Sequence, residues 1–330
     1  MPIGFDLLSQ VTPAPPSQAW QAISEYLWEQ FSAPIPESAA DSEVVRRDKD
    51  LNELDNVLSG SAWELWHDFE ASIPKAADSL VQFWESNPEG RAILILDGLS
   101  LRESTWLLTE AERRGYKIRQ AGCRASELPA ETTPFAKRLG FSQRSSLDNN
   151  GAGSAHKLKG ATTACGDLNW LDCVSLIGSQ TGFVFWHHWP DARMHELAVP
   201  GASLHKLAKE AYQSLTSDDF WSLVERLTTG RRLVITGDHG YAACGHFHDI
   251  VDKDQAAHMK TLFKSGRSAD SSETDGAWVP PIDLRLTSSS GTHQYVLGRR
   301  KWKSAGGYPT LQHGGLSLLE VFVPFIELTK

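Results

Sequence analysis

The sequence predicts an α/β protein with a mostly parallel β-sheet, helices on both faces, a helical N-terminal region and a C-terminal β-hairpin. From residue 91 onward, short apolar runs alternate with segments of helical periodicity, which is typical of parallel strands joined by helices. Residues 1–90 contain helical patterns only. Near residues 284–303, two strand-like runs flank Ser290-Gly291, as in a hairpin. We therefore expect two regions, 1–90 and 91–330.

In the first region, residues 17–31 place Trp20, Ile23, Leu27 and Phe31 at three- and four-residue spacing, which predicts an amphipathic helix. Residues 44–56 are highly charged, and we expect them to be exposed. Two further short helices are predicted over 61–73 and 76–86. We interpret the region as a helical addition that completes the core, with partner binding as the alternative.

The second region begins with RAILILDG at 91–98, a buried parallel strand by its pattern. Ser100 and Glu103 have the spacing of a capping box at the next helix. A helix is expected after Thr132 or Thr133 as N-cap, with Pro134 as its first residue and Gly140 past its end. The other predicted segments are strands at 116–123, 182–191 and 231–240, helices at 203–215 and 218–229, loops at 141–162 and 264–280, and a short helix leading into a last strand at 313–328.

The composition is that of a soluble globular chain. Of 330 residues, 41% are hydrophobic and 22% are charged. No apolar run approaches the roughly 20 residues of a membrane span, and no export signal is visible, so we expect no membrane partner and a cytoplasmic location. The four cysteines show no CxxC spacing, which favours reduced thiols. The net charge of −9 argues against bulk nucleic-acid binding, so any nucleotide partner must bind at a local site on the protein.

Acidic residues follow three of the predicted strands. These are Asp97, Asp191 and Asp238, the last with His239 beside it. Each alone is commonly an N-cap, but the carboxyl ends of parallel strands meet at one edge of a sheet. Three carboxylates there would repel one another, and a cation resolves that conflict.

Histidines complete a candidate metal site. His195 follows Asp191 by four residues, so one helical turn puts both on one face, and His313 begins a His-Gly-Gly segment. Imidazole and carboxylate ligands suit zinc or manganese better than calcium. Six ligands are about what two metal ions need. We therefore predict two divalent ions, Zn²⁺ first, with Mn²⁺ or Mg²⁺ as alternatives, bound by Asp97, Asp191, His195, Asp238, His239 and His313.

The order Asp-Gly, Thr loop, Asp-x-x-x-His, Asp-His-Gly and late His resembles the alkaline phosphatase superfamily of two-metal phosphohydrolases. Within it, ITGDHGY at 235–241 and LQHGGLSLLEVFVPFIEL at 311–328 are similar to the PglZ domain, known from bacterial phage-defence (BREX) systems and some response regulators. The resemblance covers roughly residues 91–330. It implies an alkaline phosphatase-like core.

The resemblance also implies roles for individual residues. One metal would be held by Asp97, Asp238 and His239, and the other by Asp191, His195 and His313. The nucleophile would be a hydroxyl in the PAETTP segment, with Thr132 favoured by the spacing and Thr133 second. A helix N-terminus there offers free amides to a phosphate.

Other segments have simpler interpretations beside functional ones. His246 and His248 could add a metal ligand, but a solvated loop is favoured. Trp186, His187 and His188 are expected to pack beside the site. The basic run of Arg299, Arg300, Lys301 and Lys303 fits either phosphate binding or a solvated strand edge.

The ligand pattern and the resemblance together predict a metal-dependent phosphohydrolase. The resemblance implies foremost a phosphodiesterase acting on nucleotide or other phosphodiester substrates, in phage defence or signalling. The alternative is a catalytically weak or inactive scaffold subunit of a defence complex, which acts through contacts with other proteins of the defence system. An α/β-hydrolase triad is excluded because the chain has no G-x-S-x-G.

Overall fold

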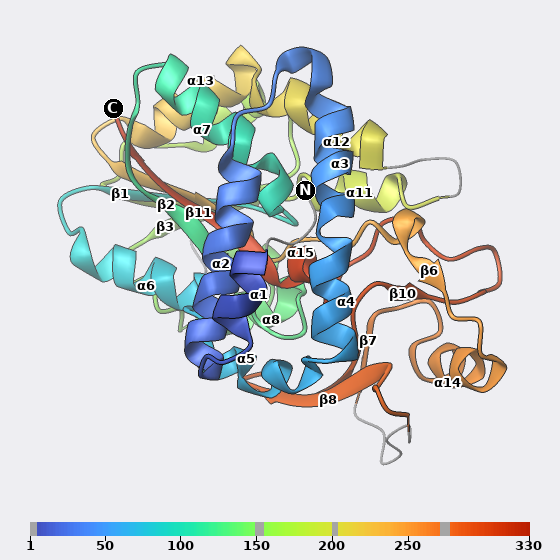
Figure 1. Cartoon of the computed structure of the whole chain (residues 1–330). Helices are drawn as coiled ribbons and strands as arrows, with labels where there is room; N and C mark the ends of the chain where they lie inside the picture. Colours follow the sequence, from blue (N-terminus) through green and yellow to red (C-terminus); the bar gives the residue numbers. More distant parts are fainter. Residues whose placement is uncertain (1–4, 149–154, 200–203, 271–277) are drawn as a thin grey trace.

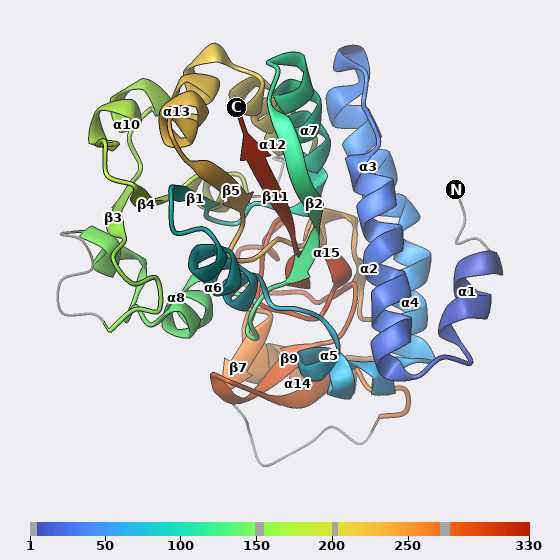
Figure 2. The same ribbon diagram turned by 90° about the vertical axis from the view of Figure 1, so that its left-hand side faces the viewer.

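A six-stranded sheet lies at the centre of the computed structural model (Figure 1 and Figure 2). The structure describes residues 5–148, 155–199, 204–270 and 278–330. The strands lie in the order β2-β11-β5-β1-β4-β3. Their bounds are β1 Arg91–Leu96, β2 Lys117–Ala125, β3 Thr162–Gly166, β4 Gly182–His187, β5 Arg232–Thr236 and β11 Phe322–Thr329.

Five of these strands run in one direction. β1 pairs in parallel with β4 and β5, and β4 pairs in parallel with β3. β11 is antiparallel to both of its neighbours, β2 and β5, so β2 runs with the other four. The mostly parallel sheet of the prediction is confirmed, with one reversed strand inside it.

Helices cover both faces of the sheet, as predicted. Side chains of β1 alternate between the faces because successive residues of a strand point to opposite sides. Ala92 and Leu94 pack in one cluster and Ile93 and Ile95 in another. The first cluster contains residues of α3 (Ala40–Asp50), α7 (Ser104–Arg113), α10 (Trp170–Leu176), α12 (Leu204–Leu215) and α13 (Asp218–Thr228). The second contains residues of α6 (Ala76–Ser86) and α8 (Thr132–Leu139).

The N-terminal region is helical, and its long helix α2 lies beside β2 and α7 (Figure 2). The elements before α6 are α1 Phe5–Val11, α2 Pro16–Ser32, η1 Glu37–Ala39, α3, α4 Asn52–Gly60, η2 Trp63–Asp68 and α5 Phe69–Ser72. α2 buries the predicted face of Trp20, Ile23, Leu27 and Phe31. That face shares a hydrophobic cluster with Phe322 of β11. The core thus crosses residue 90, and the division into 1–90 and 91–330 stays a prediction.

The expectation that residues 44–56 are exposed is wrong. They belong to α3 and α4, and both Asp48 and Asp55 are buried. Arg102 Nη2 lies 2.5 Å from Asp48 Oδ1, and Arg299 Nε lies 2.6 Å from Asp55 Oδ2. Arg299 Nη1 also lies 3.2 Å from Asp48. Partners from distant parts of the chain neutralise these charges, and this allows the helices to pack inward.

The same contacts correct both interpretations of the basic run. Arg299 is neither a phosphate ligand nor a solvated edge residue, because it is buried and binds two carboxylates of the N-terminal helices. Arg300 is half-buried, and its guanidinium donates to the Leu297 carbonyl. The two-residue strand β10 (Arg300–Lys301) pairs in parallel with β6 (His248–Asp249).

The hairpin of the prediction is present and carries a third strand. β8 (Asp283–Ser288) and β9 (Gly291–Val296) pair antiparallel, and β7 (Ser268–Asp270) pairs with β9 next to α14 (Lys253–Phe263). Part of the predicted loop 264–280 is therefore a strand, and its residues 271–277 lie outside the described chain. The loop 141–162 contains η4 (Arg144–Leu147), and its residues 149–154 likewise lie outside the description.

Two local predictions hold at the helix ends. The Ser100–Glu103 capping box forms at η3 (Leu101–Glu103), directly before α7. Gly140 ends α8 in the left-handed conformation, with φ of 93°. Of the helices in the described parts of the chain, none combines the length and apolar composition that a bilayer crossing requires.

Candidate metal centre

The three parallel strands β1, β4 and β5 end at one edge of the sheet, and an acidic residue follows each. Asp97 follows β1, Asp191 opens α11 (Asp191–Glu196) after β4, and Asp238 with His239 follows β5. The Asp191 amide donates to the Asp97 carbonyl at 2.8 Å, and the Gly98 amide donates to the Asp238 carboxylate at 2.9 Å. These hydrogen bonds hold the strand ends together, so the three carboxylates converge.

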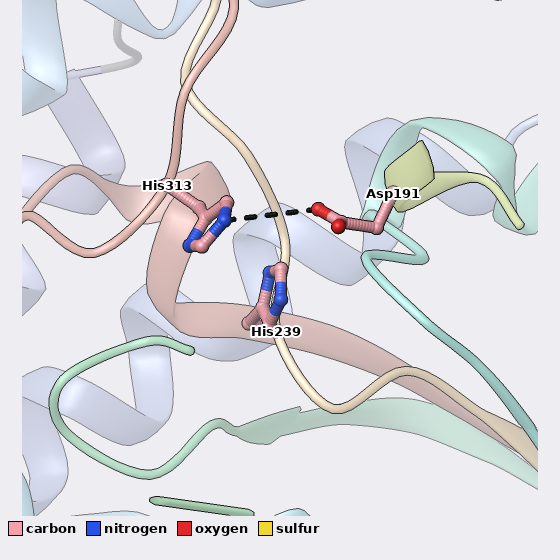
Figure 3. Close-up of side chains that lie close together, drawn as sticks. All are labelled: Asp191, His239 and His313. Carbon is pink, nitrogen blue, oxygen red and sulfur yellow. Dashed lines mark ion pairs between the residues drawn. The ribbon is translucent and has the colours of Figure 1, made fainter. Parts of the chain in front are cut away.

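The converging side chains form two groups with the geometry of metal sites. One group is Asp97, Asp238 and His239, and the other is Asp191, His239 and His313, with ligand atoms within 4.8 Å of one another in each. His239 belongs to both, and its Nε2 lies 3.6 Å from both Asp97 Oδ1 and Asp238 Oδ2. Figure 3 shows Asp191, His239 and His313 turned toward one another, with His313 Nε2 3.7 Å from Asp191 Oδ1.

His195 lies at the edge of this cluster. Its Nε2 is 3.3 Å from Asp191 Oδ2, and the side chain is 55% exposed. It stands outside both ligand groups, although its ring lies 5.4 Å from that of His313. Among the described residues, His246 and His248 are also outside both groups, and His246 Nδ1 lies 3.4 Å from Asp48 instead.

The two central imidazoles present the nitrogen that a metal requires. His239 Nδ1 lies 3.0 Å from the Gly240 carbonyl, and His313 Nδ1 lies 3.2 Å from the Ala130 carbonyl. A carbonyl only accepts, so each Nδ1 carries a proton, and Nε2 is the nitrogen that faces the cluster. Backbone carbonyls fix the tautomer of metal-ligating histidines in this way.

The carboxylates lack the partners that buried charges need. Within the described chain, neither Asp191 Oδ1 nor Asp238 Oδ2 has a hydrogen-bond partner. Burial, then repulsion from Asp238 and Asp191, raises the pKa of Asp97 well above its usual value. Burial and the neighbouring His239 lower the pKa of His313 to about 3, so it is neutral. Buried, mutually repelling acids beside the neutral His313 therefore fit divalent cations.

Thr132 lies at this cluster. Its hydroxyl is 3.2 Å from Asp97 Oδ1, to which it donates, and 3.4 Å from His239 Nε2. Thr132 is the first residue of α8, so its side chain stands where the helix amides have no intrahelical partner. The next residue, Thr133, is exposed.

The predicted start of this helix is wrong by two residues. Glu131, not Thr133, is the N-cap, and its side chain makes no capping bond. Thr132 and Thr133 are already helical, and Pro134 is the third helical residue. Proline is tolerated throughout the first turn because those amides have no acceptor in the helix.

A buried ion pair holds the His313 segment in place. Arg267 Nε donates to Glu320 Oε1 at 2.7 Å, and the Gly315 amide donates to the same oxygen at 2.8 Å. Glu320 is in α15 (Leu318–Val321), whose carbonyl at Glu320 accepts from the Gly240 amide at 3.0 Å. A Cβ at position 240 would lie 2.2 Å from the Leu319 carbonyl oxygen, so only glycine fits this approach.

One cation at the centre was not among the predicted site residues. Arg144 of η4 has Nε 3.6 Å from Asp97 Oδ2, and its Nη1 is buried without a hydrogen-bond partner in the described chain. It stands in a Ser-rich segment without strand or helix periodicity. No local pattern distinguishes it from a solvated loop residue.

Comparisons with known proteins found structural neighbours only. No family model matches the chain, and no curated protein matches it. The structures found include mouse ectonucleotide pyrophosphatase/phosphodiesterase 5, both as an inactive variant in complex with AMP and without it, and the human protein of the same name. The three share 12%, 12% and 11% identity with this chain and give TM-scores of 0.41, 0.40 and 0.40. Each match covers 72% of this chain and 87% of the other. Similarity at this level does not identify a shared activity.

Proposed function

We propose that this protein is a metal-dependent phosphohydrolase of the alkaline phosphatase superfamily that cleaves phosphodiesters. Thr132 is its nucleophile, and two divalent cations, zinc first, occupy the Asp/His cluster. The observation that carries the proposal is the position of the Thr132 hydroxyl, within 3.4 Å of both Asp97 and His239. An attacking group and buried carboxylates that repel one another thus share one site.

The ligands divide between two adjacent metal positions. Asp97, Asp238 and His239 would hold one ion. Asp191 and His313 would hold the other, and His195 would join them through the carboxylate that it already contacts. Bound cations would offset the carboxylate repulsion, polarise the phosphate oxygens and favour the ionised hydroxyl.

The residues of this chain then act as follows. Thr132 Oγ1 attacks phosphorus, and its proton leaves along the hydrogen bond to Asp97 Oδ1. The free amides of the first turn of α8 face the negative charge of the phosphate. The bond from phosphorus to one ester oxygen breaks, and the departing alkoxide takes up the proton that Asp97 received and leaves as an alcohol. Water then attacks the phosphorus of the phosphothreonine, and one of its protons returns to Thr132 Oγ1 as the remaining phosphate ester is released.

The substrate class and the biological role follow from the resemblance to PglZ domains. It favours a nucleotide or another phosphodiester, and a role in phage defence or signalling beside other proteins of such a system. The Asp/His cluster is buried and confined to one edge of the sheet, which suits a small substrate better than bulk nucleic acid.

The matched pair Thr132→Ala and Thr133→Ala tests the nucleophile. With bis-p-nitrophenyl phosphate as substrate, Thr132→Ala should lose on the order of 10³-fold in kcat with unchanged metal content, because it lacks the attacking oxygen. Thr133→Ala should retain turnover and stability, since Thr133 is exposed and caps nothing. Full turnover by Thr132→Ala would exclude a covalent mechanism through this residue.

The same measurements separate the enzyme from the scaffold. Metal analysis of the purified protein should give two ions per chain. If the ions are present and neither phosphomonoester nor diester is hydrolysed, the scaffold function replaces the enzymatic one.

A further inference from the structure

A pocket of about 410 Å³ opens beside the candidate metal centre. We name it the Trp170 pocket. Its lining residues come from β4, α10, α11 and α12 and from the segments after β3 and β4. Rings of Trp170, His187, His188 and Trp189 line it together with the charged side chains Asp167, Arg193 and Glu196.

The Trp170 pocket and the metal centre share the same edge of the sheet. His187, at the end of β4, lines the pocket, and its carbonyl accepts from the Asp97 amide at 2.9 Å. The next residue, His188, donates its amide to Gly166 at the end of β3 at 3.0 Å. Adjacent strands are about 4.8 Å apart, so the pocket begins one strand away from the carboxylates.

One part of the pocket wall consists of flat rings that hydrogen bonds and ring contacts hold in place. The Trp170 indole donates to Ser214 Oγ at 2.9 Å, and its ring meets that of Trp189 edge-on at 5.7 Å. The His187 ring lies 4.2 Å from the Trp170 ring. His187 Nε2 donates to the Leu168 carbonyl, and Nδ1 accepts from the Trp189 amide. This imidazole is therefore neutral, and it is buried against the Trp170 ring, which it helps to fix in place.

Apolar side chains gather in the same stretch of chain. Six large hydrophobic side chains are exposed in the described structure, and three of them lie within residues 168–176. Leu168, at the pocket, is 47% exposed, and Leu171 and Leu176 are 53% and 40% exposed. Apolar surface that is concentrated beside a concave site marks ligand contact.

We propose that the Trp170 pocket binds a planar aromatic group, such as a nucleobase, of the phosphodiester whose phosphate lies at the metal centre. This rests on the proposed phosphodiesterase function. Rigid indole walls favour a flat ring over an alkyl chain because a ring stacks on them with little loss of conformational freedom. The pocket makes the enzyme selective for aromatic esters.

Two ligands with the same phosphate group test the pocket. Phenyl phosphate and methyl phosphate differ only in the ring, and calorimetry on the zinc-loaded protein measures the affinity of each. Phenyl phosphate should bind about tenfold more tightly, as expected for one stacked ring. Ala192→Phe fills the pocket from α11 and should remove this preference. Leu168→Ala should reduce it, whereas Leu171→Ala, a neighbouring exposed leucine outside the lining, should not.

The outcomes separate the pocket from the proposed function. The aromatic-binding proposal is overturned if the unaltered protein binds the two phosphates with equal affinity. It is also overturned if the tenfold preference survives in Ala192→Phe. Hydrolysis of bis-p-nitrophenyl phosphate with equal affinities keeps the phosphodiesterase and rejects the pocket. A tenfold preference without any hydrolysis keeps the aromatic site and rejects the phosphodiesterase.

Discussion

Acidification should destabilise this protein through His187. The side chain is 5% exposed, and both ring nitrogens are engaged, Nε2 with the Leu168 carbonyl at 2.8 Å and Nδ1 with the Trp189 amide at 2.9 Å. An amide only donates, so protonation of Nδ1 would set two donors against each other. Burial lowers the pKa of His187 to about 4.

The size of the effect follows from the two pKa values. In the unfolded chain the pKa of histidine is about 6.5, so the folded value is depressed. The unfolded state then binds more protons than the folded state, and stability falls as the pH falls. The contribution is fully present above pH 6.5 and is lost between pH 6.5 and 4. By pH 4 the loss amounts to about 3 kcal/mol.

Urea unfolding at several pH values measures this loss against a His187→Gln variant. Glutamine keeps a donor and an acceptor but does not titrate between pH 7 and 4. All other groups titrate in both proteins, so they cancel in the difference. The variant should lose about 3 kcal/mol less than the unaltered protein between pH 7 and 4. Parallel stability curves would refute the assignment of a buried neutral imidazole.

Three further perturbations test other parts of the structure. Asp48→Ala removes a carboxylate from the buried Arg102 and Arg299 and should lower the free energy of unfolding by about 3 kcal/mol. A loss under about 1 kcal/mol in urea titration contradicts the buried ion pairs of Asp48. Gly140→Ala puts a Cβ 2.8 Å from the Ala155 carbonyl oxygen at positive φ, so Tm should fall by several degrees, and an unchanged Tm contradicts the helix end. Chelation should lower Tm, and Asp238→Asn should bind fewer zinc ions by elemental analysis, whereas equal metal content excludes Asp238 as a ligand.

The sequence predicted well the elements that depend on residues close together in the chain. β1, β4 and β5 follow from continuous apolar runs, and the Ser100 capping box follows from a spacing of three residues. The convergence of Asp97, Asp191 and Asp238 is less local, but parallel topology forces it once the three strands are identified.

The elements that the sequence could not predict depend on distant partners. Asp48 meets Arg102 54 residues away and Arg299 251 residues away, so a charged helix that looks solvated is buried. The start of α8 was misplaced because Pro134 is compatible with several positions of the first turn. Arg144 approaches Asp97 from a segment without any periodic pattern. The assignment of metal ligands and nucleophile stays a prediction until ions and turnover are measured.

The position of β11 sets the timing of folding during synthesis. This strand lies between β2 and β5, yet it follows both in sequence: β11 begins at Phe322, 197 residues after β2 ends at Ala125 and 86 residues after β5 ends at Thr236. In the sheet β2 pairs with β11 alone, so β2 has no strand partner until residues 322–329 leave the ribosome. Between residues 236 and 322 the nascent chain therefore carries two strands, β2 and β5, that both lack their β11 partner. Such edges bind other extended chains, so a ribosome-bound intermediate of this protein is a natural client for chaperones.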